Sequence, residues 1–125
     1  MTPARCIRKI IRVLTPDLLK PAYRFMASDS NPTAGHCYHA AEALYHLLGG
    51  KKKGWTPMRV RESDGMTHWW LRHSSGKIAD PTADQYRTVG EEPPYHEGRA
   101  GGFLTKDPSA RAKVIIQRIV AMQNP

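Results

Sequence analysis

The spacing of apolar residues changes once along the chain, and this change constrains the fold most strongly. In residues 37–48 the apolar side chains recur at helical spacing, and Gly49 and Gly50 form a stop signal. After Gly54 the period falls to two, which is typical of strands with one buried face. The sequence therefore predicts a helix that is followed by a small sheet.

Two turns divide the alternating region into three short strands. Met58 and Val60 alternate with arginines, a turn follows at residues 63–65, and the alternation then resumes from His68 to His73. Residues 74–76 form a second turn signal, and the short strand expected at residues 77–80 ends at a proline. The pattern predicts an antiparallel meander.

Helices are expected on both sides of the meander. The Thr-Pro-Asp signal at residues 15–17 predicts an N-terminal helix of about three turns. Asp107 and Pro108 begin a C-terminal helix. The order helix, helix, strands, helix predicts an α+β fold, and the length of 125 residues favours a single domain over residues 1–125.

The charge and the cysteine content indicate which kinds of partner and which cellular compartment to expect. The net charge of +8 favours acidic partners such as nucleic acid or an acidic substrate. The two cysteines form no disulfide framework, which fits a reducing compartment. Arg8, Lys9 and Arg12 interrupt the apolar stretch near the N-terminus, and no window has the length of a membrane span. We therefore expect a cytoplasmic protein without a membrane span.

Cys37 lies where the helix is expected to begin, and this position favours a reactive thiolate. Unpaired N–H groups and the helix dipole stabilise negative charge there. A nucleophilic cysteine also needs a base and a group that orients the base. His36 and His39 are poor bases for Cys37 because near neighbours on a helix do not face each other. His68, at the start of a strand, and Asp80, at the end of the next, are the better candidates.

These segments resemble the transglutaminase-like superfamily. The stretch Gly-His-Cys-Tyr at residues 35–38, followed by an alanine-rich helix, is similar to the nucleophile segment of that family. His68-Trp69-Trp70 and then Asp-Pro-Thr at residues 80–82 resemble its His-x-Trp and Asp-Pro-Thr block. Residues 54–60 lie where the family has its Gly-Ile-Pro-Ala-Arg-x-Val strand. The resemblance covers residues 35–82, somewhat less than half of the chain.

The resemblance implies a papain-like fold in which the helix that carries the nucleophile packs on a small antiparallel sheet. Cys37 would be the nucleophile, His68 the general base and then acid, and Asp80 the residue that holds the imidazole. It implies a cysteine hydrolase, a thiol protease or amidase first, or an acyl transferase, acting on an amide, ester or thioester carbonyl. No cofactor is implied. The substrate would be a protein, a peptide or a small acyl compound, and an acidic one would suit the net charge.

The register of the second hairpin decides whether Asp80 can orient His68. If the turn centres on Ser74, Asp80 lies opposite His68 on the same face. If it centres between Ser75 and Gly76, Asp80 falls on the other face. Asp84 is the alternative orienting residue, because the sequence fits either turn.

Further residues are candidates for the surroundings of the site. The resemblance implies an amide side chain six residues before the nucleophile as an oxyanion donor, beside the backbone N–H of Cys37, and that position is Asn31. Tyr38, Trp69 and Trp70 are candidates for binding substrate, and core packing would explain them equally well. The polar stretch from Glu91 to Thr105 is expected to form a flexible flap over the site.

Two other classes of function remain open from the sequence. A metal centre would use nitrogen and sulfur ligands, although the spacing of these residues does not favour convergence on one ion. Its candidate ligands are His36, Cys37, His39 and either His68 or His73. A basic module without catalysis would bind nucleic acid or another polyanion through strand arginines interleaved with tryptophans. The residues of that module are Arg59, Arg61, Arg72, Trp69 and Trp70.

Overall fold

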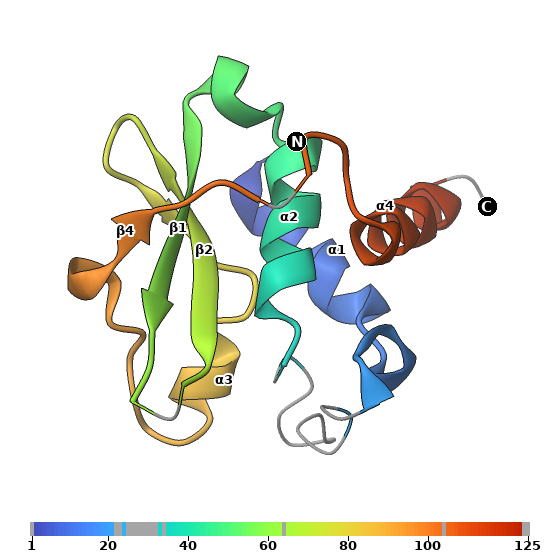
Figure 1. Ribbon diagram of the computed structural model, residues 1–125. Helices are drawn as coiled ribbons and strands as arrows, with labels where there is room; N and C mark the ends of the chain where they lie inside the picture. Colours follow the sequence, from blue (N-terminus) through green and yellow to red (C-terminus); the bar gives the residue numbers. More distant parts are fainter. Residues whose placement is uncertain are drawn as a thin grey trace.

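The protein is a four-stranded antiparallel sheet with helices packed against it (Figure 1). The computed structural model describes residues 2–21, 24, 33, 35–63, 65–103 and 105–123. The helices are α1 (Pro3–Val13), α2 (Cys37–Leu47), α3 (Asp84–Arg87) and α4 (Ala110–Gln123). The strands are β1 (Trp55–Arg61), β2 (Thr67–His73), β3 (Ile78–Ala79) and β4 (Arg99–Ala100), in the sheet order β3-β2-β1-β4. The α+β class is as predicted.

The helix and the meander predicted in the middle of the chain are confirmed. Helix α2 ends at Leu47, and Gly49 follows with φ of +92°, a left-handed conformation that glycine adopts without strain. Strands β1, β2 and β3 pair consecutively and antiparallel. Helix α2 packs on the sheet and runs alongside β2, so that both begin at the same end of the molecule (Figure 1).

The prediction for the N-terminus is wrong in its placement of the helix. The signal at residues 15–17 begins the 3-10 turn Pro16–Leu18, and no helix continues through Leu19 and Lys20. Most of residues 22–32 lie outside the described residues. The N-terminal helix is α1, which Thr2 caps by accepting from the Arg5 N–H at 3.2 Å. Its basic residues alternate with the buried Cys6, Ile10 and Val13, so the charges that interrupt the apolar stretch form the exposed face. Within the described ranges, no helix has the length and apolar character needed to cross a membrane.

Helices α1, α2 and α4 share one core with the sheet, and the C-terminal helix is confirmed. Ala112, Ile115 and Ile119 of α4 are buried in this core. The wholly buried carboxylate of Glu42 on α2 accepts from the backbone N–H of Ser109 at 3.0 Å and from its hydroxyl at 2.6 Å. Because Ser109 precedes α4, these bonds hold the start of α4 against α2.

The segment expected to be a flexible flap is joined to the sheet instead. It contains the 3-10 turn Tyr95–Glu97 and strand β4, which pairs with β1. The Gly101 N–H also donates to the Pro57 carbonyl at 3.0 Å. A Cβ on Gly98 would lie 2.2 Å from the Trp70 ring, so a glycine is needed for this close approach. An edge strand of two residues is too short to produce a periodic signal in the sequence.

Candidate active site

The register of the β2–β3 hairpin places Asp80 on the same face of the sheet as His68. Leu71 pairs with Ala79 and Arg72 with Ile78, so the turn centres on Ser75. Both registers considered from the sequence are therefore wrong. Continuing this register by one residue places Asp80 opposite Trp70. Asp80 is then a diagonal neighbour of His68, and the histidine side chain is long enough to reach it.

Asp80 holds the imidazole of His68 in a buried hydrogen bond. His68 Nε2 donates to Asp80 Oδ2 at 2.7 Å, and their side chains are 1% and 3% exposed. The Thr82 N–H donates to Asp80 Oδ1 at 3.1 Å and the Tyr95 hydroxyl to Oδ2 at 2.8 Å. The carboxylate is thus fixed from three directions, whereas Asp84 is exposed on α3 and does not contact His68.

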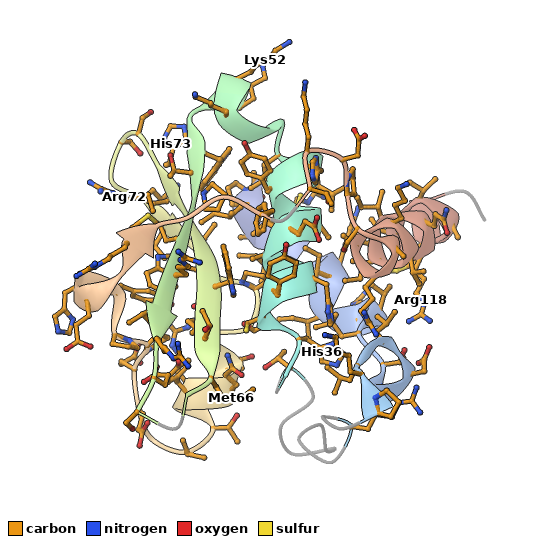
Figure 2. All side chains as sticks on the ribbon, viewed as in Figure 1. His36, Lys52, Met66, Arg72, His73 and Arg118 are labelled. Carbon is orange, nitrogen blue, oxygen red and sulfur yellow. The ribbon has the colours of Figure 1, made fainter. Side chains whose placement is uncertain are left out.

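Pro81 leaves the outer edge of β2 open beside His68. The Glu62 N–H donates to the Met66 carbonyl, so the Thr67 carbonyl points away from β1 toward this edge. Pro81 has no N–H with which to continue the β3 ladder. The first turn of α2 lies against this open edge, where the Cys37 thiol donates to the Thr67 carbonyl at 3.1 Å. Figure 2 shows His36 at the start of α2 and Met66 at the start of β2, at the same end of the molecule.

Cys37 combines a helix start with partial exposure. It is the first residue of α2, and among the described residues no side chain caps that end of the helix. Its backbone N–H is therefore one of the groups directed out of the helix start. Cys37 is partly exposed, whereas Cys6 is buried, and burial raises the pKa of the Cys6 thiol.

The surroundings of His68 favour its protonated form. Burial lowers the pKa of His68, but the hydrogen bond to Asp80, the Cys37 thiol and their charges outweigh it and raise that pKa to about 9. Trp70 stacks on the ring, with centroids 5.5 Å apart. Tyr86 packs edge-on at 4.8 Å. An imidazolium that is held beside a thiol is the arrangement that stabilises a thiolate.

Gln85 contacts the second nitrogen of His68, and the sequence analysis did not identify it. Its side-chain Nε2 lies 2.9 Å from His68 Nδ1. In this orientation the amide donates to a neutral ring, and a protonated Nδ1 would require the amide to turn so that Oε1 accepts. Gln85 lies on the single turn α3, which has no recognisable periodicity. Its only signal is a polar residue soon after the Asp-Pro-Thr segment.

A pocket of about 310 Å³ opens beside Cys37 and His68. Its other polar walls include Gln85 and Glu62, whose carboxylate accepts a hydrogen bond from the Tyr86 hydroxyl. Burial and this bond raise the pKa of Tyr86 above its usual range. The pocket can therefore accept a small group with the reacting atom at the thiol.

The aromatic residues proposed to bind substrate do not line this pocket. Trp69 and Trp70 are both buried, with 8% and 1% of their surface exposed, respectively. Trp69 packs against Tyr38, with centroids 5.1 Å apart, and Trp70 supports His68. Their apolar surfaces are used in packing, and a substrate contact by any of the three stays a prediction. Asn31, the expected oxyanion donor, lies outside the described residues.

The residues of the alternative metal centre do not converge. In the described part of the chain, no group of three histidine, cysteine or acidic residues is arranged to hold a metal ion. His36 Nδ1 and His39 Nε2 bind each other at 2.7 Å. His73 Nε2 instead donates to the Lys53 carbonyl at 2.9 Å. The candidate ligands are thus divided between separate hydrogen bonds.

Comparison of the chain with protein-family models, with curated proteins and with solved structures finds no match. The chemistry of the site is therefore argued from its own geometry.

We predict that stability is greatest near pH 6.5 and falls on both sides. Burial lowers the pKa of His36 to about 4 and of His39 to about 3. Below about pH 6.5 these histidines are protonated in the unfolded chain but stay neutral in the folded protein. The free energy of unfolding therefore falls by up to about 1.4 kcal/mol per pH unit for each ring. His68, with its pKa raised to about 9, keeps a proton that the unfolded chain releases, so stability is lost as the pH rises from 6.5 to 9.

Urea unfolding at about pH 5, 6.5 and 8.5 measures both effects. His68→Gln should remove the loss at high pH and keep the loss at low pH. Equal stability at all three values, or a loss at high pH that persists in His68→Gln, would contradict the prediction.

Proposed function

We propose that the protein is a cysteine-dependent hydrolase or acyl transferase of the transglutaminase-like, papain-related kind. The observation that supports this most strongly is the buried 2.7 Å bond between His68 and Asp80 with the Cys37 thiol beside it at a helix start. A nucleophile, a base and an orienting carboxylate define this chemistry on several unrelated folds. An amide, ester or thioester carbonyl is the corresponding substrate group, and a peptidase or amidase activity comes first among the candidates.

The first half of the reaction forms an acyl-cysteine. The Cys37 thiolate attacks the carbonyl carbon, and the electron pair of the C=O bond moves to oxygen. When this pair returns, the bond to the leaving group breaks, and His68 Nδ1 gives its proton to that group. Asp80 stabilises the imidazolium by accepting from Nε2, which leaves Nδ1 to exchange the proton.

The second half restores the thiol enzyme. Water, or another nucleophile in a transfer reaction, gives a proton to His68 and attacks the thioester carbon. The C–S bond breaks and the thiolate returns to its partnership with the imidazolium. The partial exposure of Cys37 and the adjoining pocket supply access for both reactants.

Gln85 is positioned to act as an oxyanion donor. Its amide lines the same pocket as Cys37, and its Nε2 lies 2.9 Å from His68 Nδ1, which carries a proton in the imidazolium–thiolate pair. Protonation removes the acceptor, which frees the amide N–H groups for the developing negative oxygen. The Cys37 backbone N–H is the second donor at the helix start.

Trapping of an acyl-enzyme tests the proposed function. Incubation with para-nitrophenyl acetate should release a burst of nitrophenolate equal to the enzyme concentration and leave one acetyl group on Cys37, located by peptide mass spectrometry. Cys37→Ser should abolish the burst and Cys6→Ser should retain it. A burst that survives in Cys37→Ser, or acetylation spread over lysines without a burst, would refute the proposal.

Gln85→Ala should separate acylation from simple thiol reactivity. We expect acylation to slow by about a hundredfold, because one oxyanion donor is lost. Alkylation of Cys37 by iodoacetamide develops no oxyanion, so its rate should not fall, and Asp84→Asn on the same turn should change neither rate. An equal loss of both rates in Gln85→Ala would show that Gln85 only supports the local structure.

A further inference from the structure

Strands β1 and β4 bring two arginines directly opposite each other. Arg59 pairs with Arg99 in the β1–β4 ladder, and directly paired residues share one face of a sheet. Like charges in this position are destabilising. Both arginines are exposed, so solvent screens part of this repulsion.

The paired arginines line a cavity in which guanidinium groups outnumber carboxylates. The cavity measures about 550 Å³ and is lined by Arg59, Arg61, Arg99, Val60, Thr67 and Glu97. Among the residues that the structure describes, no carboxylate forms an ion pair with any of the three guanidinium groups. Glu97 lies 3.9 Å from His96 instead. The cavity therefore presents three guanidinium groups with free donors.

Arg59 is exposed, and two neighbours constrain its side chain. Its guanidinium lies 5.7 Å from the centroid of the Trp69 ring, a cation–π contact that orders the side chain. A Cβ on Gly101 would come within 2.7 Å of Arg59 Nε, so the glycine leaves space for the guanidinium. An ordered arginine loses less entropy when it binds a ligand.

The cavity adjoins the candidate active site. Thr67 lines both this cavity and the pocket of Cys37, and its carbonyl accepts the Cys37 thiol. Trp69, beneath Arg59, contacts Tyr38, the residue that follows Cys37. The Cys37 pocket itself is a poorer site for an anion, because Glu62 and Glu91 line it and no arginine or lysine is among its described lining residues.

We propose that the cavity of Arg59, Arg61 and Arg99 binds an anionic group, a carboxylate or phosphate, of the acyl substrate whose carbonyl reacts at Cys37. Guanidinium groups match both anions with paired N–H donors. Binding of the anion relieves the repulsion between Arg59 and Arg99. The anion site stands on its own geometry, whereas its link to an acyl substrate rests on the proposed function.

The chain offers a matched control for this site. Arg72 is exposed on β2 and pairs with Thr56, so it lies on the face of the sheet opposite to Arg59. Figure 2 shows Arg72 on the side of the sheet away from α2. The basic module considered from the sequence therefore cannot use Arg72 together with Arg59 and Arg61 on one surface. Arg72→Gln removes the same charge without touching the cavity.

Titration with inorganic phosphate and with glutarate, followed by NMR on Cys37→Ser, tests the anion site without catalysis. Saturable shifts should centre on Arg59, Arg61, Arg99 and Thr67, and the tighter ligand identifies the preferred anion. Arg59→Gln combined with Arg99→Gln should weaken binding by about tenfold or more, and Arg72→Gln should not. The double variant should also melt no lower than the parent without anion, because the repulsion is removed, which checks that it folds.

Absence of saturable binding, or equal weakening by Arg72→Gln, would overturn the anion site. A single-stranded oligonucleotide that binds equally to all variants, while phosphate and glutarate do not bind, would replace it with a general polyanion surface.

A pair of esters tests the link to catalysis. The para-nitrophenyl esters of butyric acid and, singly, of glutaric acid differ in one carboxylate. In the double variant, kcat/KM for the glutarate ester should fall by about tenfold relative to kcat/KM for the ester without the carboxylate. In Arg72→Gln this ratio should stay constant. An unchanged ratio with both esters hydrolysed would overturn the substrate assignment. Failure to hydrolyse either ester, with phosphate binding intact, would overturn the proposed function and leave the anion site supported.

Discussion

The buried hydrogen bond between His68 and Asp80 is the constraint on which the candidate site depends. It exists because the β2–β3 turn centres on Ser75, which places both side chains on one face. A shift of one residue would move Asp80 to the other face and leave a buried imidazole without its carboxylate. The bonds from Thr82 and Tyr95 to Asp80 oppose such a shift, because each would be broken by it.

Pro81 links this register to the position of the nucleophile. Strand β3 ends at Ala79, and Pro81, directly after Asp80, has no N–H with which to extend the ladder. The edge of β2 beside His68 is therefore left without a strand partner. The start of α2 occupies this edge, and the Cys37 thiol satisfies the Thr67 carbonyl there. The Asp-Pro pair therefore has two physical roles, since one residue orients the base and the next makes room for the thiol.

The parts of the fold that could be predicted are those with a sustained period. Helix α2 and the strands β1 and β2 carry such patterns, and the glycines and turns around them mark their ends. Helix α1 has an equally regular pattern of buried residues, but in the sequence its basic residues indicate only an interrupted apolar stretch near the N-terminus. The two-residue strand β4 has no pattern, and its pairing depends on contacts between distant parts of the chain.

The same distinction applies to the candidate site. The proximity of Cys37, His68 and Asp80 could be anticipated from the order of helix and strands, whereas the register required the structure, because the Ser-Ser-Gly turn accommodates several pairings. Gln85 and the Arg59–Arg99 pair could not be anticipated, since each arises where irregular segments meet the sheet.

The most direct test of this account is the pH dependence of Cys37 alkylation by iodoacetamide, followed by peptide mass spectrometry. If His68 and Cys37 form an imidazolium–thiolate pair, Cys37 should react readily at about pH 6.5, well below the ordinary thiol value of about 8.5, and this reactivity should be lost in His68→Ala. The buried Cys6 in the same sample should stay unmodified. A Cys37 that is inert, or whose reactivity at low pH persists in His68→Ala, would contradict the account.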